Sequence, residues 1–310
     1  MMGKIKIAVT HGVRAKIAYE IALGLSKMRS SALSEVTVSY AFGGREFGGF
    51  LGPKLLDEGE IDIAFANPSS ITYTACNGLD PFTRRIAIKN LAVFPSWDRL
   101  GFAVKRQLGV RSLREIGERK PPLTISTRSQ GPGGATVFSV EKVLQLHGWS
   151  LAEAENWGGK VYRVGVPGDP TRLEGLRQGS YDAVFDEGIV DWADLALSNN
   201  MIFLPLEKHV FREMELLGYR TTFIPKAKFA QLNEDIPSLE FGGWALYCKA
   251  DLLDDVAYLI VKAIDQRRET IPVDAEKLEM GAICKNTENG PLCIPLHPGA
   301  EQYYRERGYL

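Results

Sequence analysis

Residues 56–66 read LDEGEIDIAFA, the end of a predicted helix, a glycine turn and a predicted strand. A similar stretch, LRQGSYDAVFD, occupies residues 176–186. Four positions match at a constant offset, namely Leu56, Gly59, Asp62 and Phe65 with Leu176, Gly179, Asp182 and Phe185. Glycine directly after a helix suits the left-handed conformation that ends many helices. The repeat favours two similar α/β lobes, with one continuous sheet as the alternative.

Strand and helix patterns alternate outward from this repeat. Apolar runs at 5–10, 36–40 and 61–66 predict strands, and apolar residues three and four apart between Val13 and Met28 predict a helix. The pattern restarts with strands at 123–126, 162–166 and 181–185. Alternating strands and helices favour a parallel-rich α/β sheet covered on both faces.

The C-terminal third predicts a return to the first lobe. The chain looks irregular after Phe203, and it then offers one strand at 244–248 and one amphipathic helix from Leu253 to Ile264. A single strand and helix make a poor third domain. We therefore expect lobe 1 at 1–96 and 241–310 and lobe 2 at 97–240. Two strand-like crossovers, near 95–101 and 221–243, would form a hinge.

Composition excludes several classes of protein. The 310 residues include 37 basic and 38 acidic side chains, a net charge of -1, which argues against a nucleic-acid partner bound by a basic face. Four cysteines are too few for a disulfide scaffold. A local disulfide between Cys284 and Cys293 is one alternative, and free buried thiols are the other.

The start of the chain, MMGKIKIAVTHG, lacks the apolar segment of a signal peptide, and 18 consecutive apolar residues occur nowhere. We expect a chain that does not itself span a membrane. If this is the whole gene product, its location would be cytoplasmic.

The loop STRSQGPGGAT at 126–136 follows a predicted strand and opens a helix. Backbone N–H groups, hydroxyls and a helix N-terminus together suit a carboxylate or phosphate. The loop fits neither the Walker pattern nor the dinucleotide-binding pattern. The predicted anion-binding residues are Ser126, Thr127, Arg128, Gly133, Ala135 and Thr136. The alternative is a glycine-rich turn without a ligand.

The first lobe offers a counterpart. Gly44 and Arg45 lie in a second glycine-rich loop, and Asn67 and Ser69 follow a strand at the edge where α/β sheets bind ligands. His11 ends the first strand. The alternatives are a surface Arg–Glu pair for Arg45 and helix capping by Ser69 or Ser70.

Two further residues are candidates for ligand contact. Asp186 and Glu187 end a strand, and because side chains alternate there, only one should point into a cleft; we select Glu187. Trp97, at the first crossover, would stack on a ligand or pack the hinge.

Metal binding and catalysis are not predicted. His147, His209 and His297 have no histidine or cysteine three or four residues away, so we expect no metal site. No GxSxG motif occurs, and we predict no cofactor and no catalytic residue.

The ending PLHPGAEQYYRERG at 295–308 resembles that of the TAXI family of TRAP-transporter solute receptors. The Leu-x-x-Gly-x-x-Asp segments, the loop before Thr136 and Ile224-Pro225 are also similar to that family. The resemblance implies a two-lobed type II periplasmic-binding-protein fold with a ligand cleft between the lobes. It further implies an extracytoplasmic receptor that closes on a small organic acid and delivers it to TRAP membrane subunits. His297 and Pro298 would pack the tail on the first lobe.

A rival hypothesis keeps the fold and changes the function. Val93-Phe94-Pro95-Ser96 resembles decarboxylase-like members of the same fold. That resemblance implies a soluble enzyme acting on an aromatic or organic acid, with His11 or Glu187 as proton donor.

Overall fold

The structure is a computed structural model that describes residues 3–10, 12–28, 30–40, 47–129, 133–273 and 277–310. The chain divides into two compact units. Unit 1 comprises Met1–Trp97, Gly131–Ala135 and Gly242–Leu310, and unit 2 comprises Asp98–Gln130 and Thr136–Phe241. The boundaries predicted from sequence lie one residue earlier at both crossovers, and they assign residues 131–135 to the second lobe.

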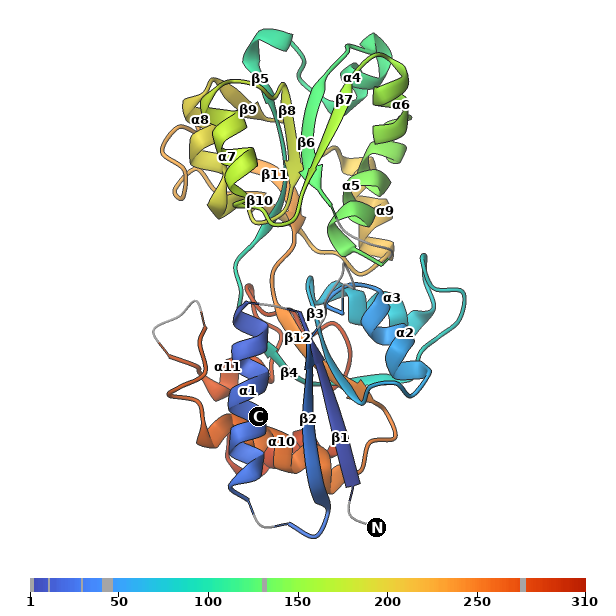
Figure 1. The fold of residues 1–310 in the computed structure, drawn as a ribbon, viewed down its shortest axis with the longest axis vertical. Helices are drawn as coiled ribbons and strands as arrows, with labels where there is room; N and C mark the ends of the chain where they lie inside the picture. Colours follow the sequence, from blue (N-terminus) through green and yellow to red (C-terminus); the bar gives the residue numbers. More distant parts are fainter. Residues whose placement is uncertain (1–2, 11, 29, 41–46, 130–132, 274–276) are drawn as a thin grey trace. The chain divides into compact units, whose positions relative to one another are not determined.

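Unit 1 contains one five-stranded sheet with strand order β2-β1-β3-β12-β4 (Figure 1). Strands β2 and β3 run parallel to β1, whereas β12 is antiparallel to both β3 and β4. The elements of unit 1 are β1 (Gly3–Val9), α1 (Val13–Ser26), β2 (Leu33–Tyr40), α2 (Leu51–Asp57), β3 (Ile63–Ala66), α3 (Ser70–Asn77), β4 (Ile88–Phe94), β12 (Trp244–Lys249), α10 (Asp254–Gln266), α11 (Met280–Ile283) and α12 (Pro298–Glu306).

Unit 2 contains a sheet with strand order β10-β11-β5-β8-β6-β7, and β9 pairs with β5 off this path. Strands β7 and β8 run parallel to β6, and β5 is antiparallel to β8. The elements are β5 (Arg99–Lys105), η1 (Arg106–Leu108), α4 (Leu113–Arg119), β6 (Thr124–Arg128), α5 (Ala135–Leu146), α6 (Leu151–Asn156), β7 (Lys160–Val164), α7 (Pro170–Arg177), β8 (Ala183–Asp186), η2 (Ile189–Asp191), α8 (Ala193–Ser198), β9 (Met201–Phe203), α9 (Lys208–Leu216), β10 (Thr221–Ile224) and β11 (Ile236–Glu240).

The internal repeat is confirmed in atomic detail. The order β2-β1-β3-β12-β4 corresponds strand for strand to β7-β6-β8-β5-β11. Asp62 exchanges two hydrogen bonds with the backbone of Lys6, at 3.0 and 2.8 Å, and Asp182 does the same with Thr124, at 2.8 and 2.9 Å. The repeated aspartate thus anchors β3 to β1 in unit 1 and β8 to β6 in unit 2.

The predicted α/β class is confirmed, with two corrections. The sheets are mixed rather than parallel-rich, because β12 in unit 1 and β5 in unit 2 run antiparallel beside the parallel strands, and β10 at the end of the unit 2 sheet is antiparallel to β11. The region after Phe203, expected to be irregular, contains α9, β10 and β11. Proline residues hid β11 from the sequence pattern, since Pro237 lies within that strand.

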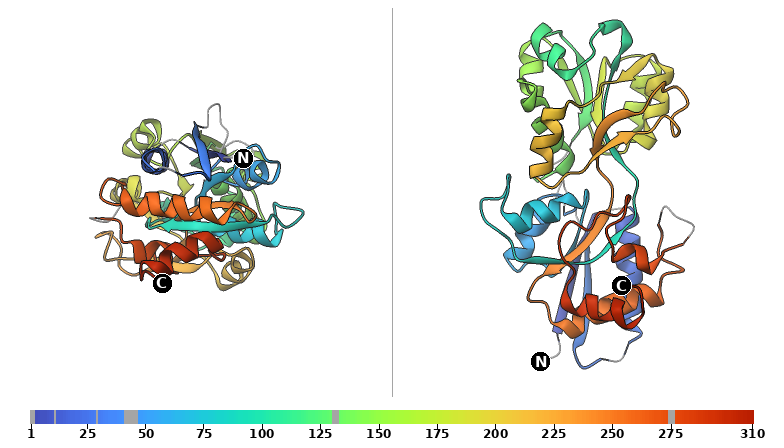
Figure 2. Two further views of the ribbon diagram at one scale, coloured as in Figure 1. Left: turned by 90° about the horizontal axis from the view of Figure 1, so that it is seen from below. Right: turned by 180° about the vertical axis from the view of Figure 1, so that it is seen from behind.

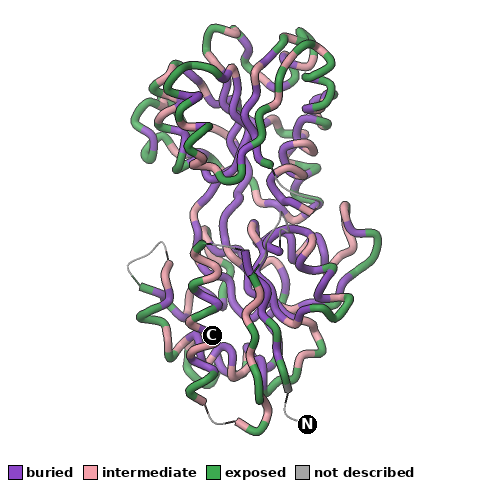
Figure 3. Tube along the Cα trace, viewed as in Figure 1, coloured by how far each residue is buried: buried purple, intermediate pink, exposed green. Residues whose placement is uncertain are grey.

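The central strands of each unit consist mostly of buried apolar residues. Figure 3 shows the buried residues in purple along these strands. In unit 1, Ile7, Ile17, Ile21 and Ile260 join one continuous core between the sheet and its helices. Helix α12 packs beside α10, and Figure 2 shows this pair from below in orange and red. His297 caps α12 by accepting the Gly299 N–H at 3.3 Å, and its own backbone N–H donates to the carbonyl oxygen of Asn90 in β4 at 2.8 Å, so His297 joins the tail to unit 1 as predicted.

All four cysteines are described and all are free, so the Cys284–Cys293 disulfide alternative is wrong. The Cys284 thiol lies 3.7 Å from the Tyr309 carbonyl oxygen, and the Cys293 sulfur lies 3.6 Å from Ser69 Oγ. Among the described helices, none is both long and apolar enough to cross a membrane.

Candidate functional site

The carboxyl ends of β1, β3 and β4 lie along one edge of the unit 1 sheet. Strand β12 fixes this arrangement because it pairs antiparallel with two of them, Ala245 opposite Ala66 and Trp244 opposite Phe94. Thr10, Asn67 and Ser69 follow these strand ends. Open α/β sheets bind ligands at this edge.

Arg14 brings a cation to the unit 1 edge. Its Nε and Nη2 donate to Thr10 Oγ1 at 3.1 and 3.0 Å, and its guanidinium lies 5.9 Å from the centre of the Trp244 ring. The contact with Thr10 fixes the arginine by hydrogen bonds, and the tryptophan face favours a cation electrostatically. Sequence reasoning missed Arg14; the available signal was an arginine in the first turn after the β1–α1 glycine.

Asn67 and Ser69 carry polar atoms beside this edge. Ser69 occupies the position before α3, but its side chain makes no capping bond to a described residue, so the capping alternative is wrong for Ser69. Asn67 Oδ1 and Ser70 Oγ are buried and have no hydrogen-bond partner among the described residues. An unsatisfied buried polar atom costs about 1–3 kcal/mol, so such atoms indicate a place for a polar ligand or water.

Unit 2 presents an equivalent edge. Arg128 ends β6, Asp186 ends the parallel strand β8, and Asp98 immediately precedes β5, which runs antiparallel to β8. Strand pairing brings these three charged residues together, although Asp98 and Asp186 are 88 residues apart in the sequence.

Two buried ion pairs occupy the unit 2 edge. Arg172 Nη1 lies 2.5 Å from Asp186 Oδ2, and both side chains are fully buried. Arg128 Nη1 donates to Glu187 Oε1 at 2.7 Å, with each side chain 10% exposed. Asp186 and Glu187 are therefore both buried, contrary to the prediction that one would face outward. The alternation rule fails because β8 ends at Asp186 and a turn begins.

Ser126 and Thr127 form hydrogen bonds that hold Arg172 and strand β8 in place. Ser126 Oγ accepts from Arg172 Nε at 2.9 Å, and the Thr127 hydroxyl donates to the Phe185 carbonyl at 2.8 Å. Arg128 Nε and Arg172 Nη2 are buried and lack a hydrogen-bond acceptor among the described residues. The edge thus retains cationic donors after its internal pairing.

Asp98 completes the network as a buried carboxyl group. Its oxygens accept from Gly188 N at 2.9 Å and from Arg99 N at 2.7 Å. Burial raises the pKa of Asp98 well above its ordinary value, and the neighbouring Glu187 carboxylate raises it further. The folded protein therefore favours a protonated Asp98. Sequence reasoning missed both Asp98 and Arg172, because nothing in their local patterns marks them as buried.

The Asp98→Asn variant tests this protonation. The folded chain retains a proton that the unfolded chain releases above about pH 4, so Asp98 lowers the free energy of unfolding as the pH rises through its folded pKa. Asparagine keeps an acceptor for Gly188 N and adds a donor for Glu187. We expect the variant to gain stability relative to the parent between pH 4 and pH 8, measured by urea unfolding. Exposed Asp194→Asn is the control, and equal pH profiles for the two variants would contradict the assignment.

The remaining predicted residues divide between the units. Gly133, at φ 93°, accepts a hydrogen bond from Phe50 N at 2.7 Å, and Ala135 begins α5; both group with unit 1. Thr136 is buried and groups with unit 2. Trp97 is half-buried at the end of a unit 1 segment. The predicted sites His11, Gly44 and Arg45 lie outside the described residues.

A separate polar cluster of unit 2 bears on the sequence argument about histidines, although it does not test the prediction of no metal site. One ligand-capable atom each from His147, Glu207 and His209 lies within 4.8 Å of the others. The expectation of no metal cluster rested on helical spacing alone, and tertiary folding brings together residues that this spacing does not relate.

Comparison with solved structures gives several matches of low sequence identity. The alkanesulfonate-binding protein SsuA from Xanthomonas axonopodis pv. citri is 11% identical over 86% of this chain and 75% of that chain, with a TM-score of 0.41. XAC2383 from Xanthomonas citri is 11% identical over 98% and 94%, with a TM-score of 0.46. A TctC solute-binding protein from Polaromonas is 13% identical over 85% and 83%, with a TM-score of 0.41.

A protein-family model gives the broader assignment. The model described as the NMT1-like family matches residues 19–308, which include β2 to β12, the unit 2 edge with Arg128 and the C-terminal helix α12, but not β1, Thr10 or Arg14. Because this match spans nearly the whole chain, the chain belongs to the NMT1-like family.

Proposed function

We propose that the protein is a solute-binding receptor for a small organic anion that carries a carboxylate. It serves a TRAP-type transport system of the TAXI subtype, outside the cytoplasm and together with TRAP membrane subunits. Membership of the NMT1-like family and the resemblance of residues 295–308 to TAXI receptors support this proposal.

The observation that carries the proposal is an arginine fixed at the ligand-binding edge of each sheet. Arg14 is held by Thr10 in unit 1, and Arg128 is held by Glu187 in unit 2. The planar guanidinium group can donate two parallel hydrogen bonds to one carboxylate. Since the net charge of the chain is -1, attraction for an anion must come from such local groups.

The proposed contacts combine the two edges with the residues predicted from sequence. Arg14, Asn67 and Ser69 act from unit 1, and Arg128 and Thr136 act from unit 2. Ser126 and Thr127 position Arg172 and β8 instead of touching the ligand. The other proposed contacts are His11, Gly44, Arg45, Trp97, Gly133, Ala135 and Glu187.

Arg14→Gln is the direct test, after a thermal-shift screen of organic acids has found a ligand. A hydrogen bond to a charged group contributes about 1.5–3 kcal/mol, so we expect affinity to fall about 10- to 100-fold. Isothermal titration calorimetry measures the change. Lys16→Gln, an exposed substitution on the same helix, should leave affinity unchanged.

The variant that tests the unit 2 contact must not destabilise the fold. Arg128→Gln alone would leave the buried Glu187 carboxylate unpaired, so the Arg128→Gln/Glu187→Gln double variant removes both charges together. We expect this variant to fold and to lose affinity. Unchanged affinity in both the Arg14 and Arg128 variants would contradict the assignment of the anion site. Consumption of the ligand during incubation would contradict the receptor proposal and favour an enzyme.

A further inference from the structure

The cluster of His147, Glu207 and His209 lies where two helices of unit 2 meet. His147 follows the last residue of α5, Glu207 precedes α9, and His209 is in the first turn of α9. His147 Nε2 is 3.7 Å from Glu207 Oε1, and His209 Nδ1 is 3.4 Å from Glu207 Oε2. The two imidazole rings are 5.0 Å apart between centres. One nitrogen of each ring therefore faces the same carboxylate.

The other nitrogen of each ring is fixed by the end of α5. His147 Nδ1 lies 2.8 Å from the Val143 carbonyl oxygen, and His209 Nε2 lies 3.1 Å from the Leu146 carbonyl oxygen. Carbonyl oxygens only accept, so both of these nitrogens carry the proton and donate. In the neutral rings His147 Nε2 and His209 Nδ1 are consequently lone-pair acceptors.

This arrangement directs three acceptors at one point, namely two nitrogen lone pairs and a carboxylate. Acceptors repel one another unless a cation or added protons lie among them. The His147 ring is buried, where a positive charge on the ring alone would lose its hydration. Its side chain is only 1% exposed, whereas those of Glu207 and His209 are about one-third exposed. The cluster is thus open to ions from solution on one side.

We propose that His147 Nε2, His209 Nδ1 and the Glu207 carboxylate form a binding site for a zinc-class divalent transition metal, with a fourth position for water. Two histidines and one carboxylate are a ligand set that zinc uses. Metal–ligand bonds of about 2.0–2.1 Å in a tetrahedron separate ligand atoms by about 3.3 Å. One ligand atom from each of the three residues already lies within 4.8 Å of the other two, and the ring nitrogens lie 3.7 and 3.4 Å from the two oxygens of the carboxylate, so small side-chain rotations would close the site. Histidines that bind metals usually donate their second nitrogen to a carbonyl, as both do in this cluster.

The ligand chemistry selects the metal. Magnesium and calcium prefer oxygen ligands, so two imidazole nitrogens favour zinc, nickel or copper. Arg114 is the nearest competing cation, with Nη2 3.4 Å from Glu207 Oε2. Bound metal would tie the end of α5 to the start of α9 and stabilise unit 2. This site is separate from the proposed anion site, so either proposal can fail without the other.

The test is calorimetric titration of chelator-treated, untagged protein with zinc chloride at pH 7.5. We expect one zinc ion per chain and a rise in Tm. His209→Ala and Glu207→Gln should each weaken zinc binding at least tenfold, because each removes a ligand. Arg114→Gln should strengthen binding, because it removes a positive charge beside the site.

Controls separate this site from other zinc binding. Glu213→Gln, an exposed carboxyl on α9, and alkylation of the free thiols should leave the affinity unchanged. Cobalt substitution, read by visible absorption, reports tetrahedral coordination independently of stability. The proposal is wrong if zinc does not bind at one ion per chain, or if His209→Ala and Glu207→Gln, folded as judged by circular dichroism, bind zinc like the parent.

Discussion

Replacing Arg172 by alanine is expected to lower the free energy of unfolding of unit 2 by about 3–5 kcal/mol. Arg172 and Asp186 form an ion pair whose side chains are both fully buried. Removing the arginine leaves a carboxylate inside the protein without its counter-ion, and Ser126 loses the Nε donor. Urea unfolding followed by the fluorescence of buried Trp149 and Trp192 reports the change in unit 2.

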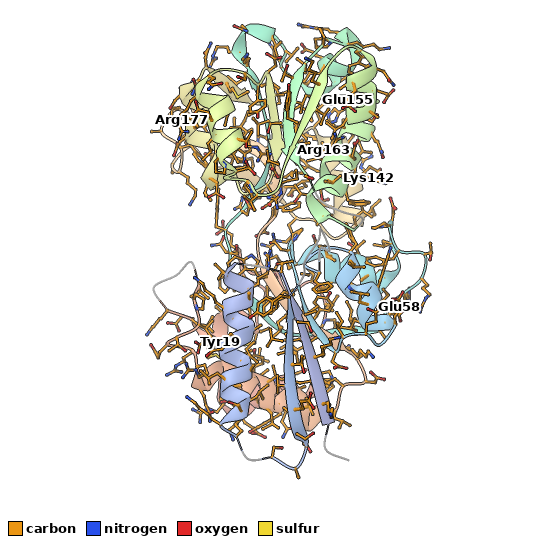
Figure 4. The ribbon with its side chains drawn as sticks, viewed as in Figure 1. Tyr19, Glu58, Lys142, Glu155, Arg163 and Arg177 are labelled. Atoms are coloured by element: carbon orange, nitrogen blue, oxygen red, sulfur yellow. The ribbon has the colours of Figure 1, made fainter. Side chains whose placement is uncertain are left out.

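Arg177→Ala is the matched control. Arg177 lies on the same helix, α7, with its side chain 57% exposed and paired with Glu174 at the surface (Figure 4). Exposed ion pairs contribute about 0–1 kcal/mol, so this variant should remain close to the parent. The Arg172→Met/Asp186→Leu double variant should recover much of the lost stability, since it removes both buried charges. If Arg172→Ala and Arg177→Ala unfold at the same urea concentration, the buried pair does not stabilise unit 2.

Replacing Gly299 by alanine is the second substitution for which a large effect is expected. An added Cβ would lie 2.0 Å from the Asp254 carbonyl oxygen and 2.7 Å from its carbon. The obstacle is backbone at the start of α10, which cannot rotate away as a side chain could. We expect unit 1 to lose about 1–3 kcal/mol, toward the upper end of the overpacking range. Thermal unfolding followed by circular dichroism measures the loss.

Gly281→Ala provides the comparison. An added Cβ at Gly281 would meet only the Tyr309 carbonyl oxygen, at an ordinary 3.7 Å. That variant should be as stable as the parent or slightly more so. Comparable losses in the two glycine variants would show that close packing of α12 on α10 is not why position 299 is glycine.

The internal repeat is the feature of the sequence that predicted most of the fold. Gly59 and Gly179 have positive φ values of 79° and 65°, which glycine adopts readily and other residues adopt rarely. Asp62 and Asp182 bond backbone groups of neighbouring strands. Both requirements are local, so they leave residue patterns that can be read without coordinates.

The local residue pattern did not predict strand β11 or helix α9. Strand β11 contains Pro237 and lies beside β5, its partner from the other end of the unit 2 segment. Helix α9 follows Pro205 in a stretch that reads as irregular. Their structure depends on partners that are distant in the chain, so a local pattern could not predict them.

The candidate site was predicted in part. The sequence identified Arg128 and Glu187 from their places at strand ends, and the structure pairs them. Asp98 was missed because its importance arises from contact with Gly188, which lies far along the chain. Arg14 had a local signal in its place in the first turn after the β1–α1 glycine, but its contact with Trp244 is long-range. Periodicity reports which face of an element is buried, and it carries no information about such long-range partners.

The sequence by itself determined the α/β class, the internal repeat, the glycine turns and the structural ending at 295–308. These features follow from hydrophobic periodicity and backbone conformation, which act over a few residues. Tertiary structure alone decided the antiparallel strands of the two sheets, the buried charge pairs and the proximity of His147 to His209. A buried charge or a ligand cluster depends on side chains from several elements converging in space, and only the folded chain specifies that convergence.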